Sequence, residues 1–406
     1  RQMCIRDRKC CFLQGGYWTL AAVAMAFTTP LLEAKGFSGT EIGILSAVKY
    51  LAVLIFQMVL GSFADKHAEK VPLQRMLILM TFVNIIFSFL FYLTGHTMWM
   101  AMLTLIVFGM TIHCASPLVD SLSIQYMNHG VKMNYAISRA CGSLCWAVFC
   151  VVVGLIADAF GANRILIFQI VVSFLFAFFA FNMDAVDFSK ERKKEEKTED
   201  LASENSDTKC ETGEVHSCFY LLKHFPKYSL FLLGLVFVFA AYNMNSTFLI
   251  DWIEGMGGNH ADYGMAQFVL AMAEIPVALV FYRIRGRVSI DKLMVVCAFF
   301  CFLRATATTF SGSVTLVILS QALELLGLSI YYVGTVYFVM DYLPQADAVK
   351  GASLINLAGM GLGEMAGSIS CGLIKDAFGL RNLMLLSSGV GFVGVVVMVW
   401  MWRRLE

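Results

Sequence analysis

Seven ionisable side chains lie well inside long apolar stretches of this sequence. A charge at the centre of a lipid bilayer costs at least ~2.5–3.5 kcal/mol, so charges that persist there usually face a polar interior and pair with one another. With three bases and four acids, one carboxyl group is left without a basic partner. Such a group can alternate between protonated and ionised forms as it faces either side of a membrane, which is the chemistry of proton coupling. The seven residues are Lys49, Asp120, Arg139, Glu274, Arg304, Glu324 and Glu364.

Some side chains near these charges are candidates for binding a polyhydroxylated solute. Asp120 and Arg139 accept and donate several hydrogen bonds, and Trp146 offers a flat apolar face after Arg139. The alternative for a lone intramembrane tryptophan is an interfacial anchor or a packing residue. Helical spacing does not decide which of the later tyrosines and asparagines face the same interior. These further candidates are Tyr242, Asn243, Asn245, Tyr331, Tyr332 and Tyr337.

The elements that hold these residues are predicted to be membrane-spanning helices. Hydrophobic residues make up 59% of the 406 residues and charged residues only 15%, whereas soluble domains are roughly 45–50% apolar. The mean hydropathy is +0.72, and runs of about 20 apolar residues suffice to cross a bilayer. The sequence therefore predicts an all-α polytopic membrane protein with twelve transmembrane helices, near 12–33, 41–64, 72–94, 98–127, 136–158, 164–184, 229–253, 262–283, 290–310, 314–341, 350–374 and 380–402.

A charged stretch divides these helices into two bundles of six. Residues 185–228 have mixed charge and few apolar side chains at their centre, so burial cannot offset the entropy of ordering them. We predict a flexible cytoplasmic linker there, between an N-terminal bundle at 12–184 and a C-terminal bundle at 229–402. Residues 1–11 are predicted to be a cytoplasmic segment, with 1–9 resembling a fragment end or an added sequence, and 403–406 a cytoplasmic tail.

An internal repeat supports this division. The segment Gly154-Leu-Ile-Ala-Asp158-Ala-Phe-Gly161 ends the fifth predicted helix, and Gly372-Leu-Ile-Lys-Asp376-Ala-Phe-Gly379 ends the eleventh. The two segments differ at one position. Equivalent helices in each half indicate a parallel repeat about an axis along the membrane normal, as in the two halves of major facilitator transporters.

The distribution of basic residues predicts the orientation in the membrane. Most of the 30 Lys and Arg residues lie at the N-terminus, in the even-numbered connections or at the C-terminus. Since cytoplasmic loops carry the excess of Lys and Arg, both termini and the linker are predicted to be cytoplasmic. Only four basic residues fall in odd-numbered connections, namely Lys35, Arg164, Lys375 and Arg381.

One short segment resembles a signature of the major facilitator superfamily. Gly61-Ser-Phe-Ala-Asp65-Lys66, after the second predicted helix, is similar to the family's GxxxD(R/K) motif. In that motif the glycine permits close helix approach and the aspartate caps or pairs at the cytoplasmic gate. The resemblance implies the same roles for Gly61, Asp65 and Lys66.

The order of the intramembrane charges resembles the oligosaccharide/proton symporter group of that superfamily, which includes lactose permease, over nearly the whole chain. Ser116-Pro-Leu-Val-Asp120 matches the group's A-P-A-V-E, and Arg139-Ala-Cys-Gly-Ser-Leu-Cys-Trp146 matches its R-M-F-G-C-V-G-W. The resemblance implies that Asp120 and Arg139 bind the sugar and that Trp146 stacks on it. It also implies that Glu274 links the sugar to the proton, with Arg304 as its arginine partner.

The chain departs from this group at several positions. The tenth helix of the group carries a His and, three residues later, a proton-carrying Glu, where this chain has Glu324 and Gly327. An Asp/Lys pair between the seventh and eleventh helices appears here as Asn243 and Glu364, and Val277 replaces a sugar-binding Asn. Galactoside specificity is therefore not implied, and the proton site stays open between Glu324 and Glu274. Sodium as the coupling ion also stays open.

We hypothesise a secondary active transporter, a proton-coupled symporter that imports a sugar, oligosaccharide or nucleoside-like solute by alternating access. The alternative is a proton-coupled drug or metabolite efflux antiporter. An enzyme is not expected, because no nucleophile and base set or metal-ligand spacing such as HExxH occurs. We expect no cofactor or metal and no nucleic-acid partner, and a monomer in the bacterial cytoplasmic membrane. Lys49 has no counterpart in the resemblance and is predicted to pair with Asp120 or Glu364.

Overall fold

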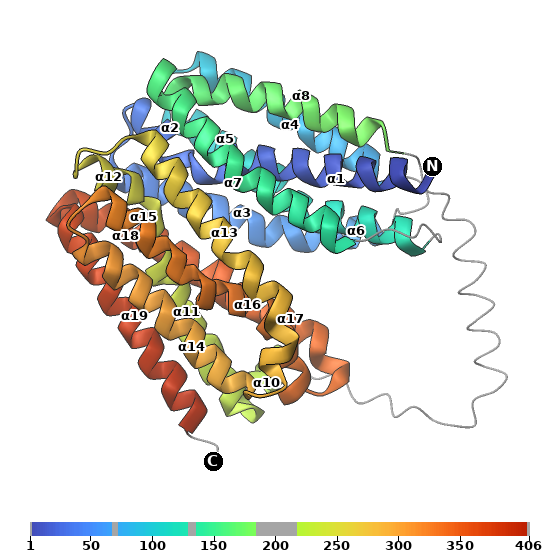
Figure 1. The fold of residues 1–406 in the computed structure, drawn as a ribbon, viewed down its shortest axis with the longest axis vertical. Coiled ribbons are helices and arrows are strands. Elements are labelled where there is room, and N and C mark those ends of the chain that lie inside the picture. Colours follow the sequence, from blue (N-terminus) through green and yellow to red (C-terminus); the bar gives the residue numbers. More distant parts are fainter. Residues whose placement is uncertain (1, 67–71, 129–134, 184–216, 404–406) are drawn as a thin grey trace.

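The computed structural model describes residues 2–66, 72–128, 135–183 and 217–403, which form helices joined by short connections (Figure 1). Among these residues, ten helices are long and apolar enough to cross a membrane, and a bent pair within 8–34 makes an eleventh. Helix α13 (His260–Arg285), outside that count, is also 26 residues long but carries several charges. Together these elements are the twelve predicted spans, in an all-α fold of two bundles.

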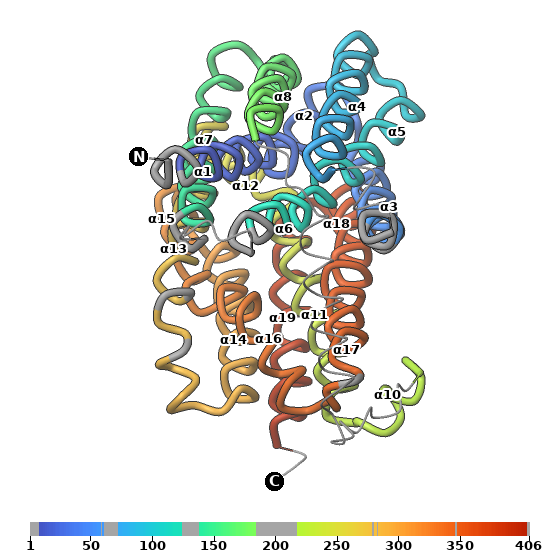
Figure 2. Tube along the Cα trace, turned by 90° about the vertical axis from the view of Figure 1, so that its right-hand side faces the viewer, coloured from blue at the N-terminus to red at the C-terminus, as the bar shows by residue number. Residues whose placement is uncertain are grey.

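The N-terminal bundle contains the first six spans (Figures 1 and 2). Helices α1 and α7 pack together, as do α4 and α8. The helices are α1 (Gln2–Ala21), α2 (Thr28–Ala34), α3 (Gly39–Lys66), α4 (Leu73–Leu93), α5 (Met98–Phe108), α6 (Ala115–Asn128), α7 (Tyr135–Phe160) and α8 (Ile165–Phe181).

The C-terminal bundle contains the other six spans, with α19 packed against α11 and α14. Its helices are α10 (Cys218–His224), α11 (Pro226–Thr247), α12 (Leu249–Glu254), α13 (His260–Arg285), α14 (Ile290–Phe310), α15 (Val314–Ser320), α16 (Leu328–Tyr342), α17 (Ala348–Asn356), α18 (Glu364–Phe378) and α19 (Leu380–Arg403). The predicted linker at 185–228 lies mostly outside the described residues. Its last part includes the short helix α10, and α11 begins at Pro226.

Spans 1, 4, 7, 10 and 11 are interrupted helices. Span 1 bends by 48° near Phe27, and span 7 breaks between α11 and α12. Span 10 passes through a 3-10 segment, Gln321–Leu326, and spans 1, 4 and 11 contain π-helical segments at Ala22–Ala26, Gly109–His113 and Leu357–Gly363. Such interruptions inside a membrane are tolerated where the backbone is buried in protein or lines a polar pathway.

The two bundles meet along two seams, each made by one helix from each bundle. Helix α3 packs along α18, and α7 packs along α13. Glycines allow this close approach: a Cβ atom on Gly372 would collide with the backbone of Gly39, and one on Gly154 would collide with the backbone of His260. The bundles converge near α2 and α12, and diverge toward the ends that carry α10 and the chain termini (Figure 1).

The repeated segment closes the convergent end with two matching contacts between the bundles. Asp158, at the end of α7, accepts hydrogen bonds from the backbone N–H groups of His260 and Ala261 at 2.9 and 2.8 Å. Asp376, at the end of α18, accepts them from Gly39 and Thr40 at 3.1 and 2.6 Å. Each carboxylate thus caps the first turn of a helix from the other bundle, where the helix dipole favours negative charge. We call these two contacts the carboxylate clamps.

Candidate functional site

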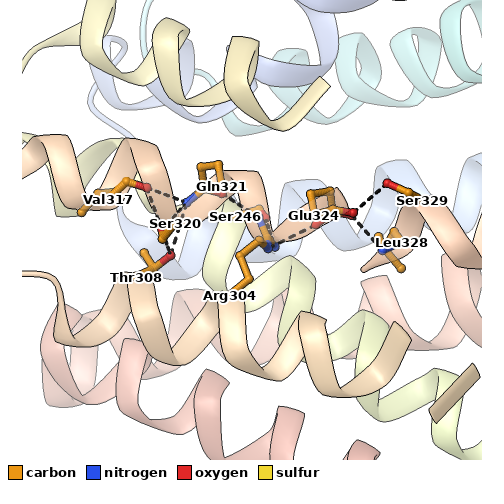
Figure 3. Close-up of polar contacts among 9 residues, drawn as sticks. All are labelled: Ser246, Arg304, Thr308, Val317, Ser320, Gln321, Glu324, Leu328 and Ser329. Carbon is orange, nitrogen blue, oxygen red and sulfur yellow. Dashed lines mark hydrogen bonds and ion pairs between the residues drawn. The ribbon is translucent and has the colours of Figure 1, made fainter. Parts of the chain in front are cut away.

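Arg304 and Glu324 form a buried ion pair within the C-terminal bundle (Figure 3). Their side chains are 1% and 0% exposed, and Arg304 Nε lies 3.4 Å from Glu324 Oε2. Arg304 also donates to Gln321 Oε1 at 2.8 Å and to Ser246 Oγ at 3.4 Å, while its guanidinium lies 4.3 Å from the ring centroid of Tyr242. Burying two charges is tolerated only when further hydrogen bonds help to satisfy them. Here the two terminal nitrogens of Arg304 are bonded, while Arg304 Nε and Glu324 Oε2 have only each other among the described residues.

The interruption of span 10 places Glu324 in this pair. The 3-10 segment Gln321–Leu326 ends at Gly327, and the free N–H of Leu328 donates to Glu324 Oε1 at 3.0 Å. Ser329 Oγ donates to the Glu324 carbonyl at 2.7 Å (Figure 3). These two bonds satisfy the Leu328 N–H and the Glu324 carbonyl at the break, and the bond to Oε1 leaves Oε2 facing Arg304.

Asp120, Arg139 and Trp146 lie together in the N-terminal bundle, with two residues of α1 that the sequence did not single out. Gln14 Nε2 donates to Asp120 Oδ1 at 2.8 Å. The Arg139 guanidinium lies over the ring of Trp18, 4.2 Å from its centroid, and Trp18 meets Trp146 edge to face at 5.9 Å. The sequence signal for Gln14 and Trp18 is their one-turn spacing on the first span.

Glu274 lies on the seam between the bundles. It is partly exposed on α13, the helix that packs along α7. The carboxyl group interacts electrostatically with Arg139 of the N-terminal bundle and with Glu324 of its own bundle. No hydrogen bond or ion pair joins it to any residue that the structure describes. The charge count predicted one carboxyl group without a basic partner, and that assignment stays a prediction.

Lys49 of α3 and Glu364 of α18 attract each other across the seam that these two helices form, which we call the second seam. Lys49 is 4% exposed, and its ammonium lies 4.7 Å from the ring centroid of Tyr50. The Tyr50 hydroxyl interacts with Glu364 and accepts a hydrogen bond from Asn243 Nδ2 at 3.3 Å. Of the two partners predicted for Lys49, the structure places Glu364 beside it.

Tyr242 and Asn243, consecutive in span 7, reach different charge groups. Tyr242 lies under Arg304. Asn243 accepts hydrogen bonds from Ser368 at 2.9 Å and Thr247 at 3.1 Å, in the group around Glu364. The gate motif is contained in α3, but the side chains of Gly61, Asp65 and Lys66 lie outside the described residues.

Comparisons with known proteins place the chain in a family. The model of the MFS_1 like family matches residues 16–386, and no curated protein matches significantly. Two crystal structures of the nucleoside transporter NupG superpose with TM-scores of 0.81 and 0.79 at 14% identity, covering 99% of this chain and 100% of that chain. A crystal structure of a peptide transporter POT in complex with alafosfalin gives a TM-score of 0.67 at 13% identity, covering 98% and 93%. The chain is therefore an integral membrane protein of the MFS_1-like family, with the major facilitator fold of a transporter.

Proposed function

We propose that this protein is a proton-coupled symporter that imports a small polar solute, a nucleoside, sugar or oligosaccharide, by alternating access. The observation that carries the proposal is the position of Glu274 on a seam between bundles, facing Arg139 without a hydrogen bond to a described residue. A carboxyl group there is exposed to changes in the relative placement of the bundles. Family membership and the likeness to transporters of nucleosides and peptides support the same class of function.

We assign the proton to Glu274 rather than to Glu324. Glu324 is fully buried, paired with Arg304 and bonded by the Leu328 N–H, so its protonation would leave a buried guanidinium without its counter-ion. Glu274 has no such bond. When it is protonated, its attraction to Arg139 is lost, and this change couples the proton to the bundle that holds the solute.

We place the solute against Asp120, Arg139 and Trp146 of the N-terminal bundle. Hydrogen bonds from a carboxylate and a guanidinium suit a ribose or a pyranose, and an indole face suits a sugar ring or a base. Nucleosides are the first class to test, because NupG is a nucleoside transporter. Lys49 and Glu364 would balance charge across the opposite seam.

We further propose that both termini lie in the cytoplasm of a bacterium and that one chain is the functional unit. The excess of basic residues in even-numbered connections supports this orientation. The convergent end, with its two carboxylate clamps, would then face the outside, and the conformation described here would face inward.

The function can be tested with purified protein in liposomes that contain a pH-sensitive dye. Uridine, adenosine, lactose and sucrose are added outside, and the internal pH is followed for the wild type, Glu274→Gln and Glu324→Gln. We expect one solute class to acidify the interior of wild-type liposomes, because each solute enters with a proton. Glu274→Gln should abolish this acidification but retain exchange of labelled for unlabelled solute.

Two other outcomes would change the proposal. If Glu324→Gln retains solute exchange without acidification while Glu274→Gln behaves as wild type, the proton site is Glu324. If no sugar or nucleoside moves protons, but lipophilic cations release them, the protein is an efflux antiporter instead.

A further inference from the structure

Two uncharged residues of α1 touch the side chains to which we assign the solute. Gln14 is fully buried and Trp18 partly exposed, and they stand four residues apart, on one face of the helix. Neither belongs to a motif that the sequence singled out. Besides apolar packing, these two side chains form hydrogen bonds and a cation–π contact.

The side-chain amide of Gln14 forms hydrogen bonds through both its nitrogen and its oxygen. Its Nε2 donates to Asp120 Oδ1 at 2.8 Å, and its Oε1 accepts from Trp18 Nε1 at 3.2 Å. The opposite orientation of the amide would set its NH₂ group against the indole N–H and its oxygen against the carboxylate. The two partners therefore fix one orientation of Gln14, and Gln14 in turn holds Asp120 at one oxygen.

Trp18 holds the second solute-binding side chain. The guanidinium carbon of Arg139 lies over the indole ring, 4.2 Å from its centroid. Stacking consumes none of the N–H donors of arginine. The two donors on Nη1 are buried without an acceptor among the described residues, so they remain for solute oxygens.

The neighbouring helix leaves room for this arrangement. A Cβ atom on Gly142 would collide with Trp18 Cδ1, so glycine at that position of α7 lets the indole lie beneath Arg139. Trp146, one turn further along α7, meets Trp18 edge to face. The indole therefore packs against two residues of α7, Gly142 and Trp146, that follow Arg139 at intervals of about one turn.

We propose that Gln14 and Trp18 are positioning residues for solute recognition, with Gln14 orienting the Asp120 carboxylate and Trp18 orienting the Arg139 guanidinium. The hydrogen bond between the two makes them one unit on α1. This inference rests on the proposed function, because it takes Asp120 and Arg139 as solute-binding groups. The first measurement below needs no solute, so the failure of either proposal can be recognised separately.

The first measurement is the reactivity of Arg139 toward phenylglyoxal, followed by peptide mass spectrometry in the purified full chain. Trp18→Leu removes the stacking surface, Trp18→Phe keeps an aromatic face without the N–H, and Gln14→Met removes the amide. Phe12→Leu is the matched control, since Phe12 lies on an exposed face of the same helix and stacks on Phe179. We expect Trp18→Leu to raise the modification rate of Arg139 about tenfold, and Phe12→Leu and Trp18→Phe to change it little.

The second measurement is uptake of labelled uridine and lactose by the same variants, with melting temperatures recorded alongside. We expect Trp18→Leu and Gln14→Met to raise the half-saturation concentration of the transported probe about tenfold with a nearly unchanged maximal rate. Trp18→Phe should rescue most of the loss. If Trp18→Leu and Gln14→Met only lower the melting temperature, or if Arg139 reactivity rises without a change in half-saturation for the transported probe, the positioning role is wrong. If wild-type protein transports neither probe but Trp18→Leu still raises the reactivity of Arg139, the function proposed above is wrong, while the stacking of Trp18 on Arg139 is supported.

Discussion

At the scale of single residues, the ion pair of Arg304 and Glu324 is a rigid part of the C-terminal bundle. Removing one partner of a buried pair leaves an uncompensated charge, which costs about 3–5 kcal/mol. We therefore expect Glu324→Gln to lower the melting temperature of the detergent-purified protein by several degrees. The double variant Arg304→Gln/Glu324→Gln should recover most of the loss, because neither charge then remains.

Glu274→Gln is the matched control for that measurement. It removes a carboxyl group that has no direct bond to a described residue, so its melting temperature should stay close to that of the wild type. Equal destabilisation by Glu274→Gln and Glu324→Gln, or no recovery in the double variant, would contradict the structural role that we give to Glu324 but not to Glu274.

Sequence reasoning found the charged members of the site because each charge in lipid demands an explanation. The structure joins Arg304 to Glu324, whereas the resemblance implied Arg304 as the partner of Glu274. The difference follows from the position of the acid one turn earlier in span 10. Gln14 and Trp18 were missed because uncharged residues on an apolar helix carry no comparable penalty, so composition does not mark them.

At the scale of elements, the glycines of the seams determine how closely the bundles approach. Gly372→Ala would place a Cβ atom against the backbone of Gly39, and overpacking of this kind costs about 1–3 kcal/mol. The cost applies only while the seam is closed. We expect faster deuterium exchange of the Gly39 and Thr40 amides, which Asp376 now holds, by a factor of roughly 5–150.

Gly389→Ala provides the control for this prediction. Gly389 lies in the interior of α19 with no atom near its missing Cβ, so alanine there should leave the exchange unchanged or slightly improve stability. Unchanged exchange at Gly39 and Thr40 in Gly372→Ala would mean that the seam yields without separating the bundles.

The spans themselves were predictable from length and hydropathy, but their interruptions were not. The segment Gln321-Ala-Leu-Glu-Leu-Leu326 consists of good helix formers, yet it is a 3-10 helix in the fold. The bonds of Gln321 and Glu324 to Arg304, from a neighbouring helix, outweigh local propensity there. Because Arg304 lies on another helix, the local sequence of span 10 does not predict this effect.

At the scale of the whole molecule, the repeat predicted two related halves, and the structure shows what the repeated segment does. Each copy supplies one aspartate to the other half, so the two clamps are equivalent under the pseudo-twofold relation between the bundles. Sequence alone did not reveal these contacts, because a carboxylate bonded to backbone N–H groups leaves no matching side chain to recognise. At the same end, Lys375 of α18 forms ion pairs with Glu33 on α2 of the N-terminal bundle and with Asp251 on α12 of its own bundle.

The clamps should control how readily the convergent end opens. Loss of a capping side chain costs about 1 kcal/mol, which shifts a two-state equilibrium roughly fivefold. We expect Asp158→Ala and Asp376→Ala each to raise the ratio of open to closed molecules by that factor. The double variant should show the product of the two, because the clamps lie on different seams and share no residue.

This ratio can be measured by double electron–electron resonance with spin labels attached at Gly95→Cys and Gly312→Cys, in a background without the native cysteines. These glycines lie in connections of opposite bundles, with open space at their Cβ positions. Asp262→Ala is the control, because Asp262 caps its own loop at Asn259 within one bundle, so its loss should leave the distance distribution unchanged. A long-distance population that grows in the order wild type, single, double would establish that opening requires both clamps to release. A distribution unaffected even in the double variant would instead mean that the other contacts between the bundles, including the packing of α3 with α18 and of α7 with α13 and the Lys375–Glu33 ion pair, hold the end closed without the clamps.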